Sequence, residues 1–198
     1  MKTIYLVDNS TLQRVDSSDV HAAMVQLNDH GIVATCLPVL LETGYSARNT
    51  ADHQQLMRRM RSSMLTLPPV PDVLEIALSI QAALFRAGKG RAAGVSDLQI
   101  AATAIHHSAE GRPVVLVHYD RDFDHIASVE PRLHSRWIVP PGSVEGHARA
   151  PANGMNADAL PRVRSPITRS RCGCRRRTAA ARRWGSPPAG SRTPRMRG

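Results

Sequence analysis

The sequence predicts an α/β fold with a mostly parallel sheet, and two observations carry this prediction. Short runs of β-branched and apolar residues recur along the first 140 residues. Between them lie longer segments with apolar residues at helical spacing. Strands that alternate with helices at these lengths are typical of a parallel sheet covered by helices. No internal repeat is present to suggest a solenoid.

Two strands and one helix are expected near the N-terminus. Residues 4–7 are β-branched or apolar and predict a buried strand, with Asp8 directly after it. Ser17 or Ser18 is expected to cap a helix that runs to about residue 28. Residues 32–36 predict the second strand.

Three helices and a loop are expected in the middle of the chain. Residues 39–48 predict one helix, and Asn49 or Thr50 can cap another that runs to about residue 64. After a proline-rich break, Asp72 is expected to cap an amphipathic helix that ends near residue 87. Residues 89–95 then form a loop rich in glycine and alanine.

One more helix and two strands are expected before residue 140. Residues 96–99 match the capping-box pattern S-x-x-Q, which predicts a helix over residues 97–107. Residues 114–117 form the most strand-like run of the chain. A short helical segment is expected near Ile126, and residues 137–139 predict a last strand.

Residues 145–198 differ in composition from the rest, so we expect a folded domain at 1–144 and a disordered tail at 145–198. The tail holds 13 of the 26 basic residues, all arginine, against two acids, whereas residues 1–144 hold 13 basic and 14 acidic residues. Its few large apolar residues cannot offset an ordering entropy of roughly 1–2 kcal/mol per residue. Two interpretations stay open: an arginine-rich arm that binds RNA or anionic surfaces, or a tail without a selected role.

Several classes of protein are disfavoured by the composition. Three cysteines, two of them in the tail, argue against a disulfide framework and for a reducing, cytoplasmic location. The apolar run at the N-terminus is too short for a signal peptide, and no later run is long enough to span a membrane. The chain has no H-E-x-x-H motif of a zinc protease, and its aromatic residues are too few for an RNA-binding sheet that works by stacking.

Acidic residues stand where the carboxyl ends of strands and a helix N-terminus are expected. Asp8 follows the first strand, Asp120 and Asp122 follow a later strand, Glu42 lies early in a helix and Asp97 opens another. In open α/β sheets, ligands bind beyond the carboxyl ends of the strands. Carboxylates that share such a place repel one another unless a cation neutralises them. Each acid taken alone is more often a solvated surface group, but together they predict a site for Mg²⁺ or Mn²⁺.

The segments that carry these acids resemble the PIN domain, and within it the VapC-type toxins of bacterial toxin–antitoxin pairs. The similarity extends over residues 1–140 and rests on four segments, residues 7–10, 41–44, 96–102 and 118–127. It implies a PIN-like three-layer α/β/α sandwich. It also implies a Mg²⁺- or Mn²⁺-dependent endoribonuclease that hydrolyses RNA with a metal-activated water.

The resemblance assigns roles to individual residues. Four residues match the acidic motif positions, which are catalytic and bind the metal: Asp8, Glu42, Asp97 and Asp120. Asp122 matches a further acid that would also bind the metal. Ser10 matches a hydroxyl that supports the first aspartate, and His118 stands where many PIN domains have a threonine. The implied partners are RNA, a VapB-type antitoxin and a second copy of the chain.

The same sequence allows other interpretations. The basic groups at residues 58–61 and 86–91 either contact RNA phosphates or form solvated helix faces, and Arg91, nearest in sequence to Asp97, is the first candidate for an RNA contact. A non-catalytic nucleic-acid binder that works through the tail is the main alternative function. A phosphatase with an aspartate nucleophile is disfavoured because position 10 is Ser, where that class needs a second Asp.

Overall fold

The computed structural model describes residues 2–109 and 111–144, and the strands among them form one five-stranded parallel sheet. The strand order is β3-β2-β1-β4-β5, and each neighbouring pair runs parallel. The strands are β1 (Thr3–Val7), β2 (Gly31–Cys36), β3 (Leu65–Leu67), β4 (Val114–His118) and β5 (Ser135–Trp137). The predicted α/β class is confirmed, whereas the predicted tail at 145–198 lies outside the described residues.

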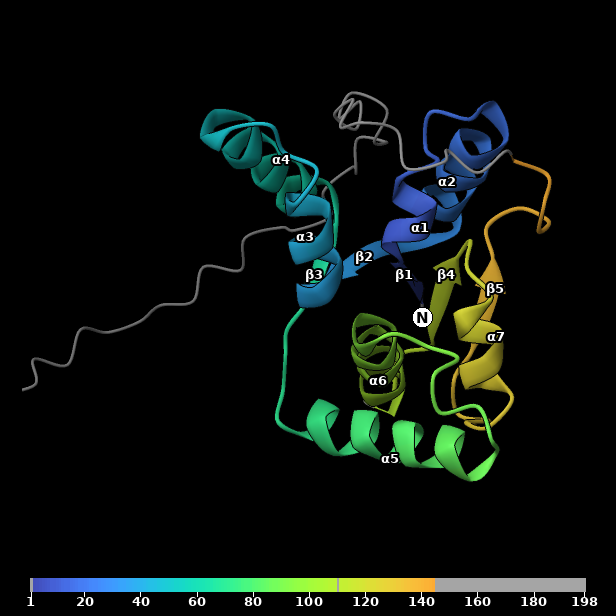
Figure 1. The fold of residues 1–198 in the computed structure, drawn as a ribbon. Coiled ribbons are helices and arrows are strands. Elements are labelled where there is room, and N and C mark those ends of the chain that lie inside the picture. Colours follow the sequence, from blue (N-terminus) through green and yellow to red (C-terminus); the bar gives the residue numbers. More distant parts are fainter. Residues whose placement is uncertain (1, 110, 145–198) are drawn as a thin grey trace, which may run out of the picture. The chain divides into compact units, whose positions relative to one another are not determined.

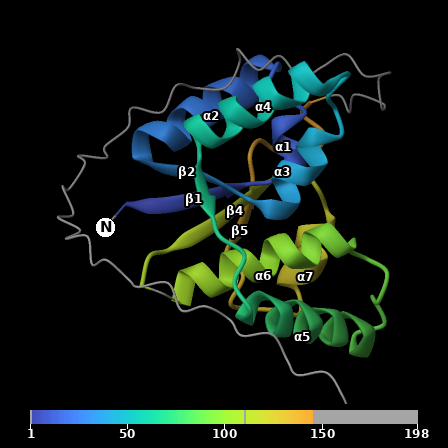
Figure 2. The same ribbon diagram turned by 90° about the vertical axis from the view of Figure 1, so that its left-hand side faces the viewer.

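Helices cover both faces of this sheet and complete the three layers. Among the described residues they are α1 (Asn9–Leu12), α2 (Ser18–His30), α3 (Leu37–Gly44), α4 (Thr50–Ser63), α5 (Asp72–Arg86), α6 (Val95–Ala109) and α7 (Asp122–Ala127). Figure 2 shows α2 and α4 on one side of the sheet and α5, α6 and α7 on the other. The chain moves toward one edge of the sheet from β1 to β3 and toward the other edge from β4 to β5. Right-handed crossovers then place the two sets of helices on opposite faces.

The core is apolar on both faces of the central strands. Leu6 and Val7 of β1 and Leu116 and Val117 of β4 are fully buried, as expected for parallel strands covered on both sides. Helix α6 lies between the sheet and α5 (Figure 1), and every residue from 100 to 105 in it is buried. Because many of these residues are alanines, α5 and the sheet can both approach the helix closely.

Some predicted boundaries are wrong for physical reasons. Strand β3 was missed because it has three residues, two of them exposed, and is defined only by its pairing with β2. The capping box at Ser96 does not form, since α6 already begins at Val95. Asp72 is the first residue of α5, not a cap with a side-chain hydrogen bond. Strand β5 begins two residues earlier than the predicted 137.

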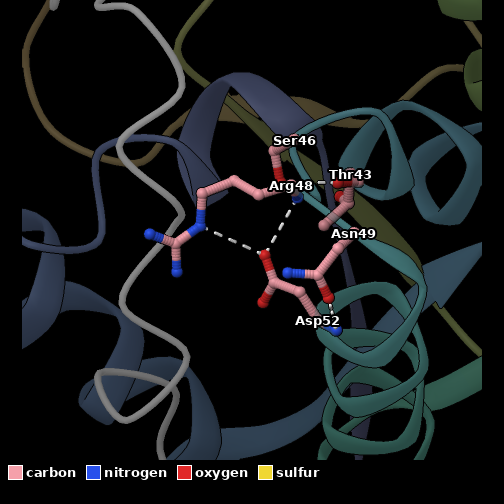
Figure 3. A network of polar contacts seen from close by, with 5 residues as sticks. All are labelled: Thr43, Ser46, Arg48, Asn49 and Asp52. Carbon is pink, nitrogen blue, oxygen red and sulfur yellow. Dashed lines mark hydrogen bonds and ion pairs between the residues drawn. The ribbon is translucent and has the colours of Figure 1, made fainter.

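The corner between α3 and α4 is held by short-range polar contacts, shown in Figure 3. Asn49 caps α4 as predicted, since its side chain accepts a hydrogen bond from Asp52 N at 2.9 Å. The Asp52 carboxylate accepts in turn from Arg48 N at 3.0 Å. Thr43 extends this structure to α1, because its hydroxyl donates to the Asn9 side chain at 3.2 Å. The helix that carries Glu42 is therefore tied to the segment next to Asp8.

Of the helices in the described part of the chain, none combines the length and apolar character needed to cross a membrane.

Candidate active site

Asp8 lies at the carboxyl end of β1, where its backbone continues the pairing with β4. Its N–H donates to Val117 O at 2.9 Å, and its carboxylate accepts from Ser10 N at 2.8 Å. The residue is only 4% exposed. Burial raises the pKa of its carboxyl, and the nearby Glu42 adds to this, while hydrogen bonds from Ser10 and Asn9 act in the opposite direction. Asp8 is thus a buried acid at the end of a strand, as predicted.

Asp97 lies in the first turn of α6. Burial raises the pKa of its carboxyl to about 6; a hydrogen bond from the Gly94 N–H opposes this rise. Three further acids, Asp8, Asp120 and Asp122, raise the pKa further through charge repulsion. Asp97 therefore interacts with acids from both the end of β1 and the segment after β4.

Asp120 and Asp122 follow β4 in one tight turn. The Asp120 carboxylate accepts from Asp122 N at 3.1 Å. Burial raises the pKa of Asp122, and the charge of Asp120 contributes to the rise. Both acids belong to the same charged group as Asp97.

Glu42 interacts with the other acids through Asp8, because its negative charge contributes to the raised pKa of the Asp8 carboxyl. The thiol of Cys36, the last residue of β2, has its pKa raised to about 12 by burial and then by the charges of Asp8 and Glu42. All five predicted acids therefore interact electrostatically at the carboxyl edge of β1, β2 and β4. Within residues 2–109 and 111–144, however, no three His, Cys, Asp or Glu side chains stand close enough together to form a ready-made metal site.

Ser10 connects the two loops that bear Asp8 and Asp120. Its hydroxyl oxygen accepts a hydrogen bond from Tyr119 N at 2.9 Å, and the hydroxyl also bonds to the Asp8 carboxylate. Sequence reasoning predicted support of Asp8 by Ser10, but the contact with Tyr119 has no sequence signal because it joins residues 109 apart.

His118 is fully buried and its ring packs against Phe123 and Trp137 at centroid distances of 5.1 and 5.2 Å. Its Nδ1 accepts from Asp120 N at 3.3 Å, so the ring proton of the neutral form lies on Nε2. Nε2 is buried and has no hydrogen-bond partner among the described residues. Burial lowers the pKa of this imidazole. His118 therefore contacts the backbone of Asp120, not its carboxylate.

Several basic residues were candidates for RNA contacts, and the structure places them on different elements. Arg91 is exposed in the loop before α6. Arg58 and Arg61 line a hollow along α4 together with His53, Gln54, Met57 and Ser62.

Two residues next to the acids were not predicted from the sequence. Arg14 donates to Ser10 O at 2.7 Å, and its guanidinium carbon lies over the Tyr119 ring, 4.6 Å from the ring centroid. Gly94 was missed too, since a glycine in a glycine-rich loop gives no signal of its contact with Asp97.

Comparison with known families decides the class of this fold and site. A family model described as the PIN domain matches residues 5–129, which include all five acids. The chain belongs to the PIN domain family. The resemblance inferred from the sequence is thereby confirmed, although the metal-binding roles of the acids stay predictions.

Curated relatives place this PIN domain among VapC proteins. It is similar to Ribonuclease VapC21 of Mycobacterium tuberculosis, with 38% identity over 144 residues that cover 72% of this chain and 99% of the relative. Ribonuclease VapC51 of the same species is 36% identical over 141 residues, covering 71% and 97%.

Solved structures show the same fold at lower identity. VapBC-1 from nontypeable Haemophilus influenzae matches with a TM-score of 0.56 and 14% identity, over 69% of this chain and 98% of the other. VapBC2 from Rickettsia felis, bound to a promoter DNA fragment, matches with a TM-score of 0.55 and 18% identity, over 68% and 98%.

Proposed function

We propose that this PIN domain is a Mg²⁺- or Mn²⁺-dependent endoribonuclease whose catalytic residues are Asp8, Glu42, Asp97 and Asp120. The observation that carries the proposal is that these acids lie near enough to one another at one sheet edge for their charges to interact. Burial, and then the charges of neighbouring acids, raise the pKa of Asp97 to about 6. The chain's relatives that are named ribonucleases extend over the same residues and support RNA as substrate.

The donor set fits a hard dication. It consists of carboxylates, and Asp122 adds a fifth to the four catalytic ones. Mg²⁺ and Mn²⁺ prefer oxygen ligands. Burial and, after it, charge repulsion raise the pKa values of Asp8 and Asp97, and either ion would offset both effects by neutralising the carboxylates. Since no three of the described acids are already grouped for binding, the carboxylates would have to draw together around an ion.

The chain's own residues would position the scissile phosphate for hydrolysis. When bound, the ion supplies Lewis-acid activation of water and neutralises charge on the phosphate. Water attacks phosphorus in line, the bond to the 3′ oxygen breaks, and that oxygen takes up a proton as it leaves. The products carry a 5′-phosphate and a 3′-hydroxyl. Arg91, exposed next to the α6 N-terminus, is our candidate for holding an adjacent phosphate.

A role as the toxin of a toxin–antitoxin pair follows from the similarity to VapC proteins. We propose a VapB-type antitoxin and a second copy of the chain as partners. Six large apolar residues exposed on or next to α3 and α5 support the burial of surface by a partner: Leu37, Leu41, Tyr45, Leu74, Leu78 and Phe85.

The deciding experiment is cleavage of a labelled RNA with Mg²⁺, with EDTA in excess, and by Asp97→Asn. A matched control is Asp29→Asn, because Asp29 is exposed near the end of α2 and precedes β2, away from the carboxyl edge. We expect Mg²⁺-dependent cleavage by the wild type and the control, and none with EDTA or Asp97→Asn. Cleavage by Asp97→Asn at the wild-type rate would refute the proposal.

A further inference from the structure

Gly94 lies directly against the carboxylate of Asp97. Its N–H donates to Asp97 Oδ2 at 2.8 Å. A Cβ built on Gly94 would lie 2.9 Å from the same oxygen and 3.8 Å from Asp97 Cγ, and beyond its chain neighbours no other atom of the described residues would be within 4 Å of it. The carboxylate therefore occupies the space that any side chain at position 94 would need.

The backbone of Gly94 does not itself require glycine. Its φ lies outside the left-handed region, unlike those of Gly88, Gly111 and Gly142. Conformational strain therefore gives no reason for glycine at this position, and the close approach of the Asp97 carboxylate is the one steric reason among the described residues.

We propose that Gly94 is a positioning residue: the absence of a side chain lets the Asp97 carboxylate close onto the Gly94 N–H, which fixes the direction in which Asp97 faces Asp8 and Asp120. The inference rests on the proposed function, since it gives Gly94 a role in holding a metal ligand. Partners of metal ligands commonly matter in this way, because they orient the ligand before the ion arrives.

A methyl group added at position 94 would displace the Asp97 carboxylate from its present position. Contacts between carbon and oxygen normally begin at about 3.3 Å. A Cβ at position 94 would lie at only 2.9 Å from the Asp97 oxygen. The backbone cannot easily yield, because Gly94 O also accepts from Leu98 N at 3.2 Å and so starts the hydrogen bonding of α6. The carboxylate would rotate away, and the N–H of residue 94 would lose its partner.

A purely structural role in starting α6 predicts a different outcome. The hydrogen bond from the Gly94 N–H to the Asp97 carboxylate also stabilises α6, because it pairs a backbone N–H at the start of the helix with a negative charge in the first turn. If that were the whole function, Gly94→Ala would lower stability by about 1 kcal/mol and leave metal binding alone. The positioning role predicts that Gly94→Ala weakens metal binding, whether or not the stability of the protein changes.

The test compares Gly94→Ala with Gly111→Ala in the full chain. Gly111 lies at the other end of α6, has a φ of +91° and would present its Cβ to open space. Gly111→Ala thus adds backbone strain without meeting any of the five candidate acids. Three quantities are measured: Mn²⁺ affinity by calorimetry, amide exchange at residue 94, and the thermal midpoint.

We expect Gly94→Ala to weaken Mn²⁺ binding and slow RNA cleavage at least about tenfold. Its residue-94 amide should exchange faster than in the wild type. Gly111→Ala should lower the thermal midpoint and keep wild-type Mn²⁺ affinity. Wild-type Mn²⁺ affinity and amide protection in Gly94→Ala would overturn the inference.

A double-mutant cycle keeps the test valid if Gly94→Ala folds poorly. If Gly94 acts through Asp97, adding Gly94→Ala to Asp97→Asn should not weaken Mn²⁺ binding further. An additive loss would overturn the inference. A wild-type protein that binds Mn²⁺ but cuts no RNA would refute the proposed ribonuclease, while the Mn²⁺ and amide measurements would still decide the role of Gly94.

Discussion

Ser10 and Tyr119 are 109 residues apart in the sequence, yet the Ser10 hydroxyl oxygen accepts a hydrogen bond from Tyr119 N at 2.9 Å. The same hydroxyl bonds to the carboxylate of Asp8. Since Tyr119 immediately precedes Asp120, one side chain connects the backbone of one acidic loop to the carboxylate of the other. Ser10 therefore helps to set the spacing between Asp8 and Asp120.

Removing this hydroxyl should affect both stability and activity. Ser10→Ala leaves the Tyr119 N–H without its partner, at a cost of about 1–3 kcal/mol in the free energy of unfolding, measured by urea denaturation. RNA cleavage should fall as well, because Asp8 loses a hydrogen bond. Ser10→Thr keeps the hydroxyl and should therefore retain much of the stability and of the cleavage activity. Equal losses of stability and activity in the Ser10→Thr and Ser10→Ala variants would contradict this role.

Cleavage should fall as the pH drops through about 6. The pKa of Asp97 is raised to about 6, so this acid takes up a proton below that pH and stops being a ligand for a cation. Saturating metal competes with the proton and should move the midpoint to lower pH. Single-turnover rates between pH 5 and 8, at low and high Mg²⁺, test this prediction. A pH–rate profile with the same midpoint at low and high Mg²⁺ would argue against this prediction.

Metal-free protein should become more stable when Asp97 is neutralised. The folded state raises the pKa of this acid above its ordinary value of 3.8, so ionised Asp97 destabilises the fold above pH 6. That cost is relieved as the pH falls from about 6 toward 4. At pH 7, Asp97→Asn should therefore raise the free energy of unfolding by about 1–2 kcal/mol after allowance for solvent screening. Urea denaturation in EDTA measures the change, and Asp29→Asn serves as the control.

Removing residues 146–198 separates the nuclease from a nucleic-acid binder that works through its arginine-rich tail. The contact of Val144 N with the Tyr119 hydroxyl, at 3.0 Å, would be retained. A nuclease built on the five acids should keep its rate of cleavage at saturating RNA, while RNA affinity falls with the loss of the 13 arginines in this segment. No cleavage by either the full chain or the truncated protein, together with loss of RNA binding on truncation, would favour the tail-based alternative.

Sequence patterns predicted what depends on local chemistry. The run before Asp8 is continuously apolar because β1 is covered on both faces, and Asn49 caps α4 because its side chain reaches a backbone N–H three residues on. The convergence of the acids was predicted from the rule that parallel strands end at one edge.

What the sequence could not predict depends on contacts between distant segments. Strand β3 exists only through its pairing with β2, and the bond between Ser10 and Tyr119 only through the neighbouring positions of β1 and β4. The capping box was predicted wrongly because the Asp97 side chain, not that of Ser96, bonds to the backbone at the start of α6. Asp97 reaches the Gly94 N–H, and the helix begins two residues before the predicted start.

The central claim is that acids from separate segments hold one cation jointly, and the most direct test is a calorimetric Mn²⁺ titration of four single variants. The variants are Asp8→Asn, Glu42→Gln, Asp97→Asn and Asp120→Asn, with Asp29→Asn as control. We predict that each of the four weakens Mn²⁺ binding while the control binds as the wild type does. Wild-type affinity in all four variants would contradict the claim.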